Sequence, residues 1–183
     1  MRSADADILL VPGITNSGPD HWQSRWEARL STARRVEQVD WEHPRCADWV
    51  ATIAAAVAEA TRPVVLVAHS LGVVAVAHAA PRLKPGTVRG AFLVGLPDIE
   101  DADVLPDLDA GFLPIPRAPL PFPSVLVASR TDPHAAYDRA ADFARAWGAE
   151  LSDAGESGHL NSESGHGPWP EGLMRFAGFL KDL

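Results

Sequence analysis

The chain lacks most of what a secreted, membrane-bound or nucleic-acid-binding protein carries. One cysteine, Cys46, stands among 183 residues, so no intramolecular disulfide can form, and a reducing compartment, the cytoplasm, is expected. No apolar run approaches the ~20 residues of a membrane-spanning helix. The polar, acidic residues 1–7 contain no apolar segment typical of a signal peptide. Basic residues are few, 16 against 24 acidic ones, and the net charge of −8 argues against nucleic acid or an anionic membrane as a partner.

The composition is that of a globular protein. Hydrophobic residues make up 46% of the chain and charged residues 22%, both ordinary proportions. The length suits one domain, 1–183, that can bury a full core. No repeat, low-complexity segment or linker divides it, and nothing in the sequence indicates an oligomeric state.

Short β-branched runs alternate with stretches of helical periodicity. Strands are predicted over Ile8–Val11, Arg35–Val39, Val64–Ala68, Val88–Val94, Val125–Ser129 and Ala149–Ser152. Helices are predicted over His21–Leu30, Ala47–Ala60, Leu71–Leu83, His134–Trp147 and Pro170–Leu180. This alternation predicts an α/β fold with a parallel sheet of about six strands and helices on both faces. If the first strand pairs with both the second and the third, the strand order is 2-1-3-4-5-6. A ligand would then bind at the carboxyl ends of strands one and three.

One short motif joins the most apolar predicted strand to the helix after it. Residues 68–72 read AHSLG, which approximates the G-x-S-x-G turn with Ala68 in place of the first glycine. Such a sharp strand-to-helix turn exposes the Oγ of Ser70 above the sheet and points the N–H of Leu71 at the same space. The small residues Ala68 and Gly72 leave room for the backbone to fold back. The motif predicts that Ser70 is a nucleophile.

A serine nucleophile needs a base, and the base needs an orienting acid. Asp132 follows the strand at Val125–Ser129, and His159 follows the strand at Ala149–Ser152, which is the order that α/β-hydrolases use. Other assignments stay open at this point. Asp132 alternatively caps the helix after it. Rival acids are Asp98, Asp138 and Asp142, and rival bases are His21, His134 and His166.

The turn after the first strand is the second element expected at the site. An oxyanion hole needs two donors, predicted to be the N–H groups of Leu71 and Ile14, with Thr15 as the second choice to Ile14. Thr15, Asn16 and His21 are further candidates for substrate contact. Between residues 96 and 123 the chain carries seven prolines and few helical signals, which predicts a long loop. Its stretch Gly111–Phe122 is expected to form the acyl side of the pocket with Phe112, Leu113 and Ile115. The alternative is that these three side chains simply cover the core.

Two other chemistries fit the sequence less well. His159, Glu163 and His166 carry metal-ligating groups within one segment, but glycines and Pro168 interrupt any helix that would give a usual ligand spacing. Cys46 has no histidine that the topology brings beside it. Neither a metal nor a cofactor is expected.

Four stretches together resemble a known group, and they span nearly the whole chain. They are residues 11–27 (VPGITNSGPDHWQSRWE), 68–72, 121–133 and 158–170. They resemble the small serine hydrolases of the α/β-hydrolase superfamily related to retinoblastoma-binding protein 9 and the bacterial YdeN-like proteins. The resemblance implies a three-layer fold without a large lid domain, and it places Ser70, Asp132 and His159 at the family's triad positions. The L-x-C-x-E segment tied to pocket-protein binding is absent, because the only cysteine lies in PRCAD.

The expected activity is hydrolysis of small carboxylic esters through an acyl-enzyme on Ser70. Family members are credited with both esterase and peptidase-like activities, so a peptidase or amidase of the same mechanism is an alternative. A weakly active or inactive protein-binding module on a retained hydrolase fold is another.

Overall fold

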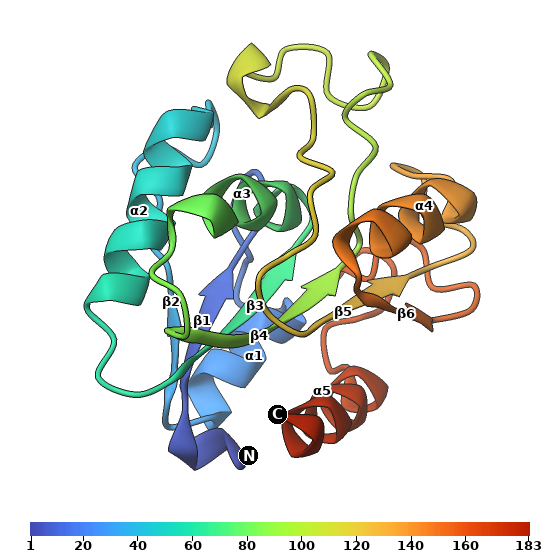
Figure 1. Cartoon of the computed structure of the whole chain (residues 1–183). Helices are drawn as coiled ribbons and strands as arrows, with labels where there is room; N and C mark the ends of the chain where they lie inside the picture. The colour runs from blue at the N-terminus through green and yellow to red at the C-terminus, as the bar shows by residue number, and fades with distance from the viewer.

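A six-stranded parallel sheet organises the molecule (Figure 1). The computed structural model describes all residues, 1–183. The strand order is β2-β1-β3-β4-β5-β6, which confirms the predicted order. The strands are β1 (Asp7–Val11), β2 (Ala33–Arg35), β3 (Val64–His69), β4 (Val88–Val94), β5 (Ser124–Ala128) and β6 (Glu150–Asp153). Adjacent strands all pair in parallel, so all their carboxyl ends lie at one edge of the sheet.

Helices cover both faces of this sheet. On one face lie α2 (Cys46–Ala58), α3 (Leu71–Ala79) and α4 (Tyr137–Trp147), and on the other lie α1 (Trp22–Arg29) and α5 (Pro170–Asp182). None of these helices has the length and apolar character needed to cross a membrane. The result is the three-layer α/β arrangement that the alternation of patterns predicts.

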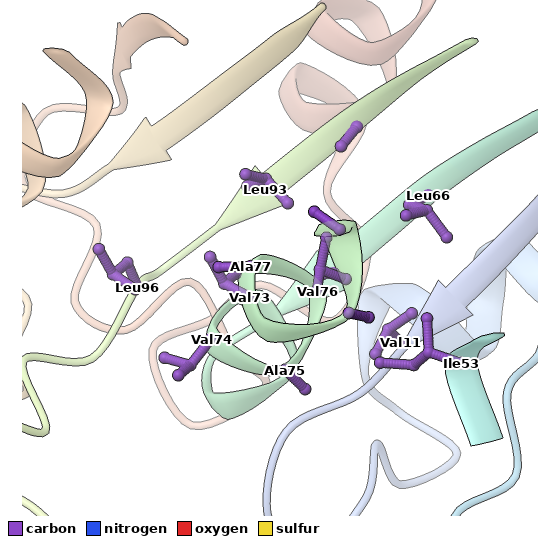
Figure 2. Packing of buried hydrophobic residues seen from close by; sticks show 14 of the residues in the cluster. Val11, Ile53, Leu66, Val73, Val74, Ala75, Val76, Ala77, Leu93 and Leu96 are labelled. Carbon is purple, nitrogen blue, oxygen red and sulfur yellow. The ribbon is translucent and has the colours of Figure 1, made fainter. Parts of the chain in front are cut away.

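Two apolar cores, one on each face, explain why the central strands are apolar throughout. Along β3, Leu66 and Ala68 belong to the core beneath α2, α3 and α4, whereas Val65 and Val67 belong to the core beneath α1 and α5. Successive side chains of a strand point to opposite faces, so a strand that is covered twice must be apolar at every position. Figure 2 shows Leu66 and Leu93 of neighbouring strands packing against α3. Helix α3 is buried almost all round, which accounts for its alanine and valine content.

Most predicted elements differ from the structure by a few residues at their boundaries. Helix α3 ends at Ala79 rather than at the predicted Leu83, and a 3-10 helix over Ala80–Arg82 follows it. The second strand is Ala33–Arg35 rather than Arg35–Val39, because its pairing with β1 begins at Ala33 and ends where Leu10 pairs with Arg35. Val39, whose apolar side chain suggested a strand position, is 79% exposed. Helix α4 begins at Tyr137, three residues after the predicted His134, because residues 132–136 form a turn first.

The segment between β4 and β5 is an ordered loop, as its prolines predict. It passes over the carboxyl edge of the sheet and contains one short 3-10 helix, Ala110–Phe112. Arg139 of α4 binds its first part through Asp98, at 2.7 Å, and Glu100, at 2.7 Å. This ion-pair network fixes the part of the loop that begins beside the end of β4.

Candidate active site

Ser70 occupies a strained turn between β3 and α3. Its backbone has φ 54° and ψ −130°, a conformation that L-residues rarely adopt. Two glycines allow the backbone to pack closely around this turn. A Cβ on Gly72 would lie 2.6 Å from the carbonyl oxygen of Pro12, and one on Gly13 would lie 2.7 Å from the Cβ of Ser70, so neither position has room for a side chain. The end of β1 therefore packs directly against the turn that presents the serine.

The structure brings Ser70, His159 and Asp132 into one hydrogen-bonded chain. His159 Nε2 lies 2.9 Å from Ser70 Oγ, and His159 Nδ1 lies 3.0 Å from each carboxylate oxygen of Asp132. The side chains of His159 and Asp132 are 9% and 4% exposed. An ionised carboxylate only accepts, so the Nδ1 of His159 donates to Asp132, and Nε2 of the neutral ring accepts from the serine hydroxyl. Each residue follows the carboxyl end of a strand: Ser70 follows β3, Asp132 follows β5 and His159 follows β6.

The rival acids have other partners. Asp98 pairs with Arg139, and Asp142 pairs with Arg117 and Arg145. Asp138 is exposed on α4. Asp132 does not cap α4, since the residue that precedes the helix is Ala136. Its Oδ1 instead accepts the N–H of His134 at 2.9 Å, which orients the carboxylate within its own turn.

The rival bases do not reach Ser70 by a hydrogen bond. His166 lies against Ser164 and Trp169. His21 accepts the N–H of Gln23 at the start of α1, and His134 packs edge-on against the His159 ring, with centroids 4.5 Å apart.

Two backbone N–H groups beside Ser70 are free to bind an oxyanion. Leu71 is the first residue of α3, and the N–H of a first helical residue has no acceptor within the helix. Ile14 N–H forms no hydrogen bond, whereas Thr15 N–H donates to the carbonyl of Trp41 at 2.9 Å. The geometry thus favours Ile14 over Thr15 as the second donor.

A buried arginine holds the turn that carries Ile14. Thr15 and Asn16 both have positive φ, 64° and 67°. Arg35 Nη1 donates to Asn16 Oδ1 at 2.6 Å and to the carbonyl of Ser17 at 2.8 Å, and the guanidinium is paired with Glu27. These contacts offset the cost of two adjacent left-handed residues.

A cavity of about 360 Å³ opens above Ser70, and only part of its lining was predicted. Ile14, Thr15, Asn16 and His21 all line it, together with Ser70 and His159. The rest of the lining includes Gly13 and Gly18 from the segment after β1 and His69 at the end of β3. The loops after β4, β5 and β6 supply the other seven residues: Pro97, Val104, Leu105, His134, Asn161, Ser162 and Glu163. Each of these seven residues follows a predicted strand. That position was the one feature of the sequence that could have placed them at the site.

The prediction that Phe112 and Leu113 form the acyl side of the pocket is wrong. Phe112 is fully buried against Trp49 and His78, in the core of α2 and α3, and Leu113 is 44% exposed away from the cavity. Two hydrogen bonds to distant parts of the chain explain the placement: Asp109 accepts the N–H of Cys46 at the start of α2, and His78 Nε2 donates to the carbonyl of Phe112. The earlier part of the same loop, at Val104 and Leu105, supplies the apolar wall instead.

The alternative metal site does not form. No group of three histidine, cysteine, aspartate or glutamate side chains is arranged to hold a metal ion. Cys46 is buried at the start of α2, where burial and the nearby Asp109 raise the pKa of its thiol to about 11. That shift disfavours the thiolate, which is the reactive form.

Two buried histidines beside His159 are held neutral. Burial, with a smaller effect of Arg35, lowers the pKa of His21 to about 4, and burial holds the pKa of His69 well below its usual range. The rings of His21, His69 and His159 follow one another at centroid separations of 4.8 Å and 4.9 Å. The uncharged rings of His21 and His69 keep positive charge out of the serine's surroundings.

These shifts make stability depend on pH. Below the ordinary histidine pKa of 6.5, the unfolded chain binds a proton at His21 that the folded chain refuses until about pH 4. The free energy of unfolding should therefore fall as pH is lowered from 7 to 4, by on the order of 3 kcal/mol from this ring. Urea unfolding at four pH values measures it. His21→Asn, which retains an acceptor for Gln23, should flatten the dependence, while His43→Asn at an exposed site should not. Equal slopes in all three proteins would contradict the assignment.

Comparison with known proteins places the chain in a family. The serine hydrolase family matches residues 8–178. A protein described as a YdeN-like hydrolase from Pectobacterium atrosepticum has a similar structure, with a TM-score of 0.84 and 35% identity over 97% of this chain and 91% of that one. No curated protein matches the sequence.

More distant structures share the fold. The ydeN product of B. subtilis has a TM-score of 0.76 at 20% identity, covering 96% of this chain and 99% of its own. Esterase 2 of Thermogutta terrifontis has a TM-score of 0.70 at 16% identity, covering 100% of this chain and 85% of its own. With the family match and the arrangement around Ser70, these findings lead to one conclusion: the chain belongs to the serine hydrolase family, among its small YdeN-like α/β-hydrolases.

Proposed function

We propose that the protein hydrolyses small carboxylic esters through an acyl-enzyme on Ser70. The observation that carries the proposal is the unbroken chain of hydrogen bonds from Ser70 Oγ through His159 to Asp132, beside two free N–H groups. This is the arrangement that acyl transfer to serine requires.

The reaction follows from these contacts. Ser70 Oγ attacks the ester carbonyl while His159 Nε2 accepts the hydroxyl proton, and Asp132 stabilises the imidazolium. The N–H groups of Leu71 and Ile14 bind the oxyanion of the tetrahedral intermediate. His159 then passes the proton to the leaving alcohol, and the acyl group stays on Ser70. A water molecule repeats the sequence: His159 accepts its proton, its oxygen attacks the acyl carbon, and Ser70 leaves with the proton.

A fluorophosphonate probe separates this proposal from a binding module without activity. The probe forms a covalent bond with a serine only where base and oxyanion hole activate it. We expect one label per wild-type molecule and none on Ser70→Ala, with mass spectrometry as the readout. Ser31→Ala, which removes an exposed serine hydroxyl away from the cavity, is the matched control and should still label. A folded wild-type protein that stays unlabelled would favour the binding module.

Ester and amide substrates distinguish the esterase from a peptidase or amidase. Both classes of substrate use the same residues, so the geometry favours neither by itself. A panel of acyl esters and aminoacyl amides with a shared reporter group measures the preference as a ratio of kcat/KM. We expect the esters to be favoured, because the cavity lining supplies few apolar side chains to bind a polypeptide.

The cavity's size predicts a preference for short acyl groups. It measures about 360 Å³, and Ile14 and Leu105 separate it from a neighbouring depression of about 650 Å³. Wild type should therefore favour acetyl and butyryl esters over octanoyl esters. Leu105→Ala should join the two spaces and raise the octanoyl-to-acetyl ratio of kcat/KM about tenfold, equivalent to burying roughly two more methylenes.

Leu113→Ala is the matched control for this change. It removes the same atoms from the same loop, but at a position outside the cavity, and should leave the chain-length profile unchanged. If both variants shift the profile equally, Leu105 does not line the acyl site.

A further inference from the structure

The loop that carries His159 has internal hydrogen bonds, such as that from the N–H of Leu160 to the carbonyl of Ser157 at 3.2 Å, but its backbone is strained. It follows β6 and contains four residues with positive φ: Gly155 at 69°, Gly158 at 55°, Leu160 at 53° and Gly165 at 87°. Leu160 is the only one of them that is not a glycine, and a left-handed conformation is unfavourable for so bulky a residue. A loop of this kind keeps one conformation only where surrounding groups hold it.

The surrounding groups act on both sides of the histidine. Before it, the N–H of Ser157 donates to Ser129 Oγ at 2.9 Å and that of Gly158 donates to Thr131 Oγ1 at 3.1 Å, so the exit of β5 holds this part. From His159 onward these hydroxyls make no contact, and the main chain needs other partners.

Two buried ring N–H groups bind consecutive carbonyls of the loop. His69 Nε2 lies 2.9 Å from the carbonyl oxygen of His159, and Trp22 Nε1 lies 2.9 Å from that of Leu160. A carbonyl only accepts, so His69 carries its proton on Nε2, and its depressed pKa keeps the ring neutral in that form. Both rings are buried, and both come from rigid elements, the end of β3 and the first turn of α1.

Resting on the proposed hydrolase function, we propose that His69 and Trp22 are positioning residues that fix the base His159 against the nucleophile Ser70. His69 precedes Ser70 directly in the chain. The end of β3 therefore positions both Ser70 Oγ and, through the hydrogen bond from His69, the main chain of His159. Trp22 holds the strained residue that follows. Neither ring forms a hydrogen bond with Ser70 Oγ, so each acts through His159.

Two substitutions at His69 test this role, because one keeps a hydrogen-bond donor without the imidazole ring and the other removes the donor. His69→Gln retains an N–H donor near the position of Nε2, while His69→Leu removes it. We expect His69→Leu to lower kcat for 4-nitrophenyl acetate about 10²-fold with KM changed less than about threefold, and His69→Gln to restore most of the loss. Trp22→Phe should lower kcat about tenfold. Trp26→Phe, in the same aromatic cluster but without a hydrogen bond from its ring, should change little.

A second readout does not depend on turnover. The Nδ1 proton that His159 donates to Asp132 should give a far-downfield proton NMR signal, lost through solvent exchange in His69→Leu and kept in His69→Gln. If wild type resists fluorophosphonate but this pattern holds, the hydrolase function fails and the positioning role stands. The inference is overturned if His69→Leu keeps both signal and kcat, or if Gln fails to rescue. If His69→Leu does not fold, equal kcat and equal signals in Trp22→Phe and Trp26→Phe overturn it.

Discussion

Ser70→Ala and His159→Ala should each lower kcat for an activated ester by about 10³-fold or more, and the double variant should be little worse than either. The reason lies in the 2.9 Å contact between Ser70 Oγ and His159 Nε2. A serine without its base is a poor nucleophile, and a base without its serine has no proton to accept. The two side chains therefore act as one unit, and their losses do not multiply.

Steady-state rates with 4-nitrophenyl acetate, corrected for uncatalysed hydrolysis, measure this. His78→Ala is the matched control for the base: it also removes a hydrogen-bonded imidazole, but one that binds the carbonyl of Phe112 at a distance from the cavity. It should keep most of the activity. Losses that multiply in the double variant would show that the two residues work independently, against the proposed mechanism.

The sequence predicted the sheet and the group around Ser70 because both depend on topology. Continuous apolar runs such as Val64–Ala68 are typical only of strands covered on both faces, so they identify the sheet's centre. Once the strand order is set, the residues after β3, β5 and β6 must meet at one edge. The positions of Ser70, Asp132 and His159 relative to one another follow from that meeting.

The wall of the cavity could not be predicted in the same way. The loop over residues 96–123 has no helical or strand periodicity in its apolar residues, so the sequence does not show which of them face the core and which face the cavity. Phe112 and Leu105 are both apolar, and the sequence does not distinguish their roles. Phe112 enters the core because Asp109 accepts the N–H of Cys46 in α2 and His78 of α3 donates to the carbonyl of Phe112. Such hydrogen bonds join residues far apart in the chain, and no local pattern reveals them. The same holds for Arg35, predicted only as the start of a weak strand, which holds the turn at Asn16.

Asp132→Asn should lower kcat on the order of 10⁴-fold while leaving the fold intact, as expected when the acid of such a triad loses its charge. Both carboxylate oxygens of Asp132 lie 3.0 Å from His159 Nδ1, so the native side chain only accepts from that nitrogen. An amide can turn its N–H₂ toward Nδ1. The proton of the neutral ring then moves to Nε2, where it faces Ser70 Oγ, and the base can no longer accept the serine proton.

The same change at Asp98 is the matched control, because Asp98 also follows a strand of the sheet and was the leading rival for the acid. Asp98→Asn weakens the ion pair with Arg139 at 2.7 Å, which holds the loop over residues 96–105 to α4. We expect it to reduce stability and to alter KM, with kcat within about tenfold of wild type. Circular dichroism and urea unfolding establish that both variants fold. If Asp98→Asn is the variant that abolishes turnover and Asp132→Asn is nearly as active as wild type, His159 is oriented by a different carboxylate from the one assigned, and the mechanism must be redrawn around Asp98.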